Sequence, residues 1–396
     1  MKKNIKGLIM ASIQTSPHPL VFKLGNAEAL GFTAPVSDDI AIRTWTRSLE
    51  GMQKEAIVAY GPTGTAWRMV CDEGPYLNGT DLAPFPLAFF TAGLAADYMS
   101  AVLASLRQHR IEYRDIRLVQ DNVYTMEGSA LKGTMTGGAL PVSLEAQIDS
   151  DVSAGDIEEA VTAALASSPA GALLREPLTS AFTVTLNGEP LPPRRVAALA
   201  GKPEPEPRGF DEAGPAAGGE FAADIIEKLE SADIVHGIEG GAGSSLTAEQ
   251  KRTLQIRGIC TLRDDGMKEI KVQLFKPIGS CFHFLSDDSN DAGGRERAPS
   301  GLVYLSAGIA FCYMTQLGRY AHIVKKPLES YRIVQDTCFR SAAKKNGEGG
   351  ADPVKTHVYL KTREDKDYAL TLVDMGEQTC FLHAACRSGV ETKLTL

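Results

Sequence analysis

The stretch AGLAADYM at residues 92–99 returns as AGIAFCYM at residues 307–314, and this repetition decides the fold. The two copies are offset by 215 positions, and the same offset pairs RLVQD at 117–121 with RIVQD at 332–336. It also pairs EGMQKEAIVAYGPTG, from residue 50, with DGMKEIKVQLFKPIG, from residue 265. A single offset held over about seventy positions predicts that the chain contains one module twice.

Each copy has the same predicted order of elements. Two short strand-like segments joined by a turn at Gly51 or Gly266 predict a β-hairpin. A third strand, a polar loop that ends in proline and a long apolar helix follow, over 87–109 in one copy and 302–324 in the other. More strands, a second helix (154–167 in the first copy) and a closing strand complete the module. The sequence therefore predicts an α+β fold in which antiparallel sheets cover a buried helix.

The repeat divides the chain into three parts. Residues 1–190 form the first predicted module and residues 246–396 the second. Residues 191–245 are rich in Pro, Gly and Glu, which predicts an extended linker. Within the linker, GEFAADIIEKLE from Gly219 has the pattern of a short amphipathic helix.

Composition and charge exclude several classes of protein. The net charge of -8 argues against a nucleic-acid partner, which would require a basic face. Seven cysteines spread along 396 residues predict a reduced, cytoplasmic protein rather than a disulfide scaffold. No CxxC motif or His/Cys cluster has zinc spacing, so no metal and no cofactor is expected. The apolar stretches at 82–106 and 299–318 are long enough to span a membrane, but their Gly- and Ala-rich composition favours helices buried in a core.

Two of the cysteines differ from the others. Most cysteines lie in strand-like runs, where a buried free thiol is the ordinary interpretation. Cys312 lies in the first half of the long apolar helix, where the helix dipole favours a thiolate. Cys380 lies just before the final segment, 68 residues later, and this spacing alone does not show that the two side chains meet.

The loop with proline, the helix motif A-G-x-A-x-C, a cysteine near the start of the second helix and a closing strand resemble the OsmC/Ohr family of osmotically inducible and organic hydroperoxide resistance proteins. The resemblance covers both copies but not the linker. Members of that family are homodimers with two long helices crossing at the centre. The resemblance therefore implies that the tandem copies form a pseudo-dimer within one chain, which is a monomer or assembles into a higher-order dimer.

The resemblance also implies roles for particular residues. Cys312 matches the cysteine that attacks the peroxide, and Cys380 matches the resolving cysteine that forms a disulfide with it. Asp97 and Ser168 occupy these places in the first copy, so that site cannot perform thiol chemistry. The chain departs from the family at Phe381, where a proline is usual, and at residues 298–300, where Ala-Pro-Ser replaces Asn-Pro-Glu and the family's glutamate is missing.

The resemblance also implies that an arginine of the first hairpin stabilises the thiolate of the attacking cysteine. Arg47 and Arg263 are the two candidates, and the sequence does not choose between them. The implied function is a thiol-dependent peroxidase that reduces a small organic hydroperoxide, or another small hydrophobic substrate, and is regenerated by a dithiol reductant. Nucleic acid and membranes are not expected as partners.

Two alternatives remain open. His383 follows Cys380 by three residues, so a Cys–His pair could support nucleophilic hydrolysis instead. A ligand-binding protein without catalysis would also preserve the module while leaving the cysteines as core residues. Asp97, a lone charge on an apolar helix, is expected in either case to meet a cation or backbone donors, because an unpaired buried carboxylate is costly.

Overall fold

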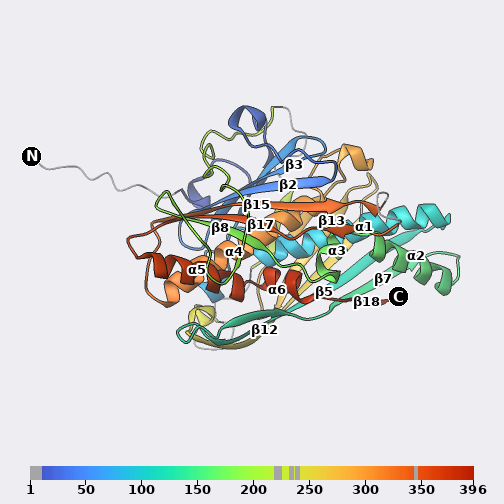
Figure 1. Ribbon diagram of the computed structural model, residues 1–396. Helices are drawn as coiled ribbons and strands as arrows, with labels where there is room; N and C mark the ends of the chain where they lie inside the picture. The colour runs from blue at the N-terminus through green and yellow to red at the C-terminus, as the bar shows by residue number, and fades with distance from the viewer. Residues whose placement is uncertain (1–10, 218–224, 232–235, 237–240, 343–346) are drawn as a thin grey trace, which may run out of the picture.

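The computed structural model describes residues 11–217, 225–231, 236, 241–342 and 347–396. Within these residues the chain forms an α+β fold of two mixed sheets and six α-helices. The helices are α1 (Pro86–His109), α2 (Ala154–Ser167), α3 (Pro169–Arg175), α4 (Gly301–Ile323), α5 (Lys366–Thr379) and α6 (Phe381–Ser388). The strands lie on both sides of the two long helices, with β2 and β15 on one side and β12, β5 and β7 on the other (Figure 1).

Each sheet takes strands from both halves of the chain. One sheet has the order β1-β4-β3-β2-β15-β17-β8-β10, and the other has the order β11-β14-β13-β12-β5-β7-β18. The first-half hairpin strands are β2 (Ile40–Ser48), β3 (Lys54–Tyr60) and β4 (Thr65–Cys71), and their second-half counterparts are β12 (Glu249–Leu262), β13 (Lys268–Lys276) and β14 (Cys281–Ser286). The strands after the long helices are β5 (Asp115–Ser129), β7 (Val142–Asp149) and β8 (Ala181–Leu186), then β15 (Ser330–Arg340), β17 (Lys355–Lys361) and β18 (Thr392–Thr395). The remaining strands are β1 (Val21–Lys23), β6 (Thr136–Ala139), β9 (Glu189–Leu191), β10 (Ala197–Ala198), β11 (Ile226–Glu230) and β16 (Gly350–Ala351).

In both sheets, the two halves of the chain are connected by the same kind of strand pair. Strand β2 pairs antiparallel with β15 of the other half, and β12 pairs antiparallel with β5. The predicted order of elements is observed in both halves, with α1 and α4 within a residue of their predicted bounds and α2 at its predicted bounds. Ser153 caps α2 by accepting a hydrogen bond from the Asp156 N–H. The hairpin turns at Gly51 and Gly266 have φ values of 59° and 85°, which glycine adopts at no steric cost.

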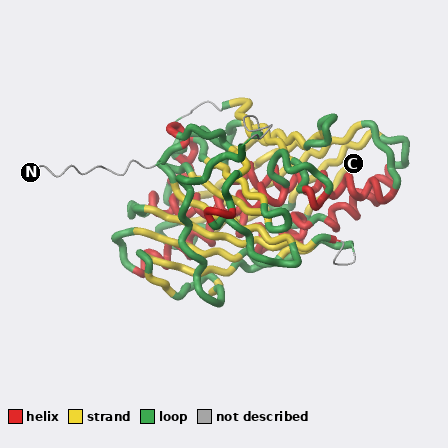
Figure 2. Tube along the Cα trace, turned by 90° about the horizontal axis from the view of Figure 1, so that it is seen from above, coloured by secondary structure: helices red, strands yellow, loops and turns green. Residues whose placement is uncertain are grey.

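The long helices α1 and α4 are the only two among the described residues that are long and apolar enough to cross a membrane. In this structure they pack against each other between the sheets, and their buried side chains join one continuous core. Figure 2, seen from above, shows strands and loops of one layer lying over part of the helices. Their close approach depends on Gly93 and Gly308, which are related by the 215-residue offset.

Replacing Gly308 with alanine should lower the free energy of unfolding by about 2–3 kcal/mol, because a Cβ there would overpack the helix crossing. The added carbon would lie 2.7 Å from the backbone nitrogen of Phe90, which cannot turn aside as a side chain can. Urea unfolding measures the change. Gly155→Ala is the control, since its Cβ would meet nothing closer than Ser153 Oγ at 3.9 Å, and its stability should be unchanged or up to about 1 kcal/mol higher. Equal stabilities of the two variants would contradict this packing.

The described first part of the segment between the halves, residues 191–217, packs against the outer face of one sheet. Phe210 joins Trp45 and other apolar side chains in a second, smaller core on that face. Glu204 forms an ion pair with Arg43 at 2.8 Å. The predicted helix from Gly219 is wrong where it can be checked, because residues 226–230 form β11 at the edge of the other sheet. The start of that segment lies outside the described residues.

Candidate active site

The structure brings Cys312 and Cys380 together. Cys312 lies in the middle of α4, and Cys380 is the N-cap of α6, at its junction with α5. Their sulfurs are 3.4 Å apart, within contact distance, and both side chains are buried. A short movement of either thiol therefore allows a sulfur–sulfur bond to form.

A histidine completes the pair. His383 Nδ1 lies 3.1 Å from Cys380 Sγ, and the ring packs between Phe182 and Tyr313 at centroid distances of 5.6 and 5.2 Å. The ring is 1% exposed, and its Nε2 atom has no hydrogen-bond partner among the described residues. His383 is therefore held by packing with one nitrogen aimed at Cys380.

The two thiols differ in acidity. Burial raises the pKa of Cys312, and so does the hydrogen bond in which it donates to Cys380. Burial opposes ionisation of Cys380 as well, but its pKa is lowered overall. The lowering comes from the hydrogen bond with Cys312, from the charge of His383, and from hydrogen bonds donated by the His383 ring and backbone. Cys380 is therefore the more acidic thiol of the pair, whereas the sequence favoured a thiolate at Cys312. The difference arises because the first turn of α6, with its free N–H groups, lies against Cys380.

A small cavity of about 20 Å³ opens beside Cys312 and not beside Cys380, with room for about one water molecule, so an organic substrate would have to displace lining side chains to reach the sulfur. Its polar walls include Glu73 and Arg252, which come from different halves of the chain. Burial lowers the pKa of Arg252 to about 10, although Tyr76 and Glu73 oppose the shift, so the guanidinium remains charged at neutral pH. Its Nε–H has no partner among the residues that the structure describes.

Glu73 is held in place by several neighbours. It accepts hydrogen bonds from Thr315 Oγ1 at 2.5 Å and from Tyr76 OH at 2.8 Å, and Lys54 Nζ lies 3.9 Å away. Burial raises the pKa of Glu73, and Lys54 and the two hydroxyl donors lower it in part. Glu73, on the loop after β4, supplies a carboxylate to the cavity beside Cys312 even though the family's own glutamate position is lost.

The first half contains a second buried pair of side chains, arranged like Cys312 and Cys380 but without sulfur. Ser168 Oγ donates to Asp97 Oδ2 at 2.5 Å, in the place of the thiol pair. The N–H groups of Ala170 and Gly171 reach Asp97 and Ser168, as those of the first turn of α6 reach the two sulfurs. Asp97 thus meets backbone and hydroxyl donors, as predicted, and no arginine reaches it among the described residues.

The flanking charges correspond too. Lys268 Nζ lies 2.7 Å from Asp288 Oδ1, and Ser100 Oγ donates to the same carboxylate at 2.7 Å. Asp288 and Ser100 are related by the 215-residue offset to Glu73 and Thr315. The repeat in the sequence could have revealed these residues. The 215-residue offset aligns Glu73 with Asp288 and Ser100 with Thr315, and in both sites the carboxylate of one half accepts a hydrogen bond from the hydroxyl of the other.

Asp97 should make the stability depend on pH. Burial raises its pKa to about 6, with Asp288 adding to the shift and the hydrogen bonds from Ser168 and Ala170 and the charge of Lys268 opposing it. The folded state therefore binds more protons than the unfolded state between about pH 4 and 6, and stability falls as the pH rises through this range. Asp97→Asn should be more stable than the natural protein at pH 8, by up to about 2 kcal/mol, and similar to it at pH 4. Urea unfolding at both pH values measures this, and a difference that stays constant with pH would contradict it.

Neither predicted arginine is brought to the cysteine pair. Arg47 lies on the outer face of β2, where it pairs with Glu55 and Asp211 at 2.7 Å and stacks on Phe210. Arg263 lies at the tip of the β12–β13 hairpin, 3.4 Å from Asp265. Strand periodicity explains the first placement, because Arg47 alternates with residues that face the helices.

Comparison with known proteins gives limited information. No family model matches the chain, and no curated protein matches it. A solved structure described as an OsmC-like hydroperoxide resistance protein from Jannaschia sp. CCS1 is similar at 20% identity. The match covers 32% of this chain and 79% of that one, with a TM-score of 0.21.

Proposed function

We propose that this protein is a thiol-dependent peroxidase that reduces organic hydroperoxides through Cys312 and a Cys312–Cys380 disulfide. The observation that carries the proposal is the 3.4 Å contact between two buried thiols, only one of which borders the cavity. Two sulfurs in contact, one of which borders a cavity, allow the first to be oxidised and the second to capture it as a disulfide.

The reaction follows from the positions of the protons. Cys312 passes its proton to the Cys380 thiolate and attacks the outer oxygen of the hydroperoxide, so that the O–O bond breaks and a sulfenic acid forms. The departing alkoxide takes the proton that Cys380 has just received and leaves as an alcohol, with Arg252 beside the cavity to stabilise its charge. The Cys380 thiolate then attacks the sulfenic sulfur and displaces hydroxide, which takes a proton from solvent and leaves as water. In sum, one thiol, one thiolate, one hydroperoxide and one proton from solvent give a disulfide, an alcohol and water, and a dithiol reductant restores the two cysteines.

We further propose that the two halves form a pseudo-dimer within one chain, with one thiol site and one site that serves structure. Three observations support this interpretation. The order of elements is repeated, each sheet contains strands from both halves, and the Asp97–Ser168 pair lies in the first half where the thiol pair lies in the second. Each site takes residues from both halves, as Cys312 and Glu73 illustrate. A single-chain protein would then need no second copy to complete its site, and a reducing cytoplasm would supply the dithiol.

Counting free thiols before and after one equivalent of cumene hydroperoxide tests the function. Two of the seven thiols should be lost, and peptide mapping should find Cys312 joined to Cys380. Retention of all seven thiols would exclude a peroxidase that uses this pair.

A cysteine hydrolase is the second candidate, favoured by the contact of His383 Nδ1 with Cys380 Sγ at 3.1 Å. Cys380 is fully buried and does not border the cavity, which argues against its attack on an ester. Activated esters give a direct comparison. Acylation of Cys380 by such an ester, with no thiol loss to hydroperoxide, would favour the hydrolase.

A further inference from the structure

A larger cavity lies at the C-terminal end of α4, away from the cysteine pair. Its volume is about 670 Å³, in the range of small-molecule sites. Segments from both halves enclose it: the β2–β3 turn, the loop after β4, the segment around Leu246, and the end of α4 with the start of β15. The lining residues are Gly51, Met52, Leu77, Asn78, Leu246, Gly318, Ala321, His322, Lys325, Pro327, Leu328 and Tyr331.

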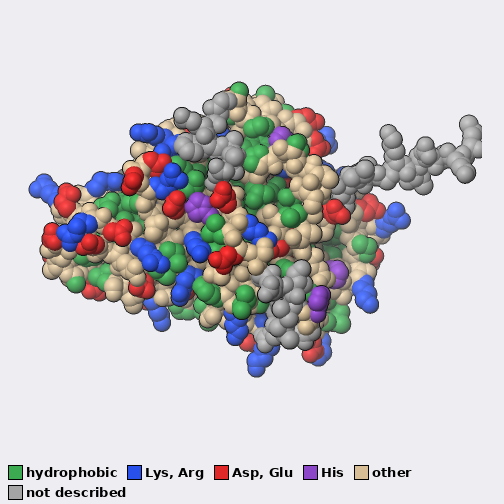
Figure 3. Space-filling model, turned by 180° about the vertical axis from the view of Figure 1, so that it is seen from behind, with side chains coloured by type: hydrophobic (Ala, Val, Ile, Leu, Met, Phe, Trp, Pro, Cys, Tyr) green, Lys and Arg blue, Asp and Glu red, His purple; other side chains and the backbone are tan. Residues whose placement is uncertain are grey.

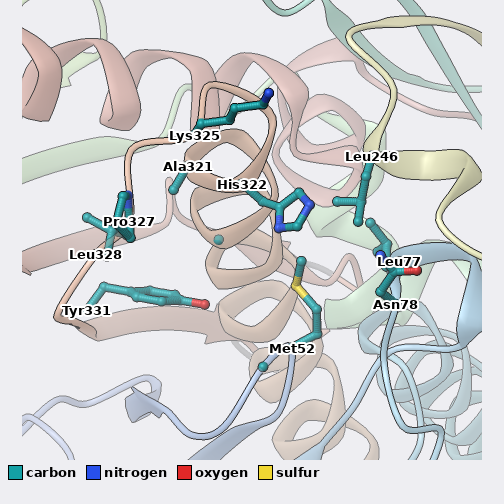
Figure 4. Close-up of a pocket in the computed structure, with 12 residues that line it drawn as sticks. Met52, Leu77, Asn78, Leu246, Ala321, His322, Lys325, Pro327, Leu328 and Tyr331 are labelled. Carbon is teal, nitrogen blue, oxygen red and sulfur yellow. The ribbon is translucent and has the colours of Figure 1, made fainter.

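The lining combines apolar side chains with the ammonium of Lys325 and the imidazole of His322 at one side. Figure 4 shows the His322 ring directed from α4 toward Leu77 and Leu246, with Met52 below it and Lys325 above. None of the twelve lining residues is acidic. Among the described residues, no hydrogen bond or ion pair engages the His322 ring or the Lys325 ammonium, whereas the neighbouring Lys326 pairs with Glu364. Two nitrogen donors are thus available beside an apolar surface.

Three of the carbonyl groups in the last turn of α4 are already hydrogen-bonded. A helix C-terminus normally exposes carbonyl groups that repel an anion. Here the last carbonyls accept backbone hydrogen bonds, from Val324 N–H to Tyr320, from Lys325 N–H to His322 and from Lys326 N–H to Ala321. Lys325 adopts a left-handed conformation, φ 57°, which ends the helix at the rim of the cavity. The remaining helix dipole is a small opposing effect beside the charge of an ammonium group.

We infer that this cavity binds an amphipathic organic anion. Its acidic group would accept hydrogen bonds from Lys325 and His322, and its apolar body would lie against Met52, Leu77 and Leu246. The charge of Lys325 and the apolar walls together select against cations and against small hydrophilic anions. Two sources have this chemistry: a substrate that enters by this route, or a separate ligand that does not react. Leu77 borders both this cavity and the one beside Cys312, so the two sources predict different effects on the thiols.

Calorimetric titration of the full chain with decanoate tests the inference. Decanoate should bind at least tenfold more tightly than acetate, which lacks the chain, or decyltrimethylammonium, which reverses the charge. Lys325→Glu should weaken decanoate binding at least tenfold, whereas Lys202→Glu, the same change at an exposed linker position outside the cavity, should leave it unaltered. Equal binding of the cationic and anionic probes, or unchanged binding in Lys325→Glu, would overturn the inference.

The binding site does not depend on the proposed thiol chemistry. Cys312→Ser should bind decanoate as the natural protein does, so a failed peroxidase assay leaves this result standing. The rate at which uncharged cumene hydroperoxide removes the thiols then separates the two sources. Slowing by saturating decanoate identifies the cavity as the substrate route, and an unchanged rate identifies a separate ligand.

Discussion

Cys312→Ser should abolish hydroperoxide turnover, with a loss of at least about a thousandfold, because no other thiol borders the cavity. Serine has nearly the same shape, and the hydroxyl can donate to Cys380 as the thiol does. The free energy of unfolding should therefore change by no more than about 1 kcal/mol. A coupled assay that follows consumption of the hydroperoxide measures turnover, and urea unfolding measures stability.

Cys386→Ser is the matched control. Cys386 is also buried and lies on α6, but it belongs neither to the sulfur pair nor to the cavity lining. Its variant should retain turnover. Cys380→Ser should still allow one attack by hydroperoxide, with the sulfenic acid on Cys312 left unresolved and detectable by a dimedone-type reagent. Full turnover in Cys312→Ser would refute the peroxidase.

Arg252→Gln should slow oxidation of Cys312 by about 100- to 1000-fold, the effect of removing one donor to an anion that develops during a reaction. Arg252 borders the cavity with its charge retained and its Nε–H unpaired among the described residues. Its contribution should be greatest when the O–O bond breaks. Stopped-flow measurement of the second-order oxidation rate isolates this step from regeneration.

Arg257→Gln supplies the comparison on the same strand. Arg257 lies on the opposite face of β12 and pairs with Asp121 at 2.7 Å, 42% exposed, so its removal should leave the oxidation rate unchanged. Similar losses in both variants would indicate a general effect of positive charge. An unchanged rate in Arg252→Gln would remove this residue from the reaction.

Local patterns predicted the elements well. The long helices and the hairpins follow from periodicity and turn residues, which act over a few positions. The exchange of strands between the halves does not follow from any local pattern, since β2 and β15 are nearly 300 residues apart and could as well pair within a half or between two chains. Residues 226–230 were misassigned because Ile226 and Leu229 have the spacing of a helix face, whereas pairing with β14 at the sheet edge holds the segment as a strand.

The site was predicted in part. Cys312 and Cys380 were identified, yet their neighbours Arg252 and Glu73 were not, because they come from distant strands and loops whose approach depends on the whole fold. Strand alternation offered a clue for Arg252, which shares the inward register of Leu254. Arg47 has the opposite register and reaches the linker instead.

The exchange of strands has a consequence for synthesis on the ribosome. When residues 1–190 have emerged, β2 and β5 each lack the neighbour that they have in the finished sheets, because β15 and β12 are still to be translated. An exposed strand edge invites pairing with other chains. The free edge of β5 can be covered once residue 262 has emerged, whereas that of β2 must wait for residue 340. The nascent protein therefore passes through an interval in which the edge of β2 stays open, and chaperone binding during that interval would decide how much of it reaches the native state.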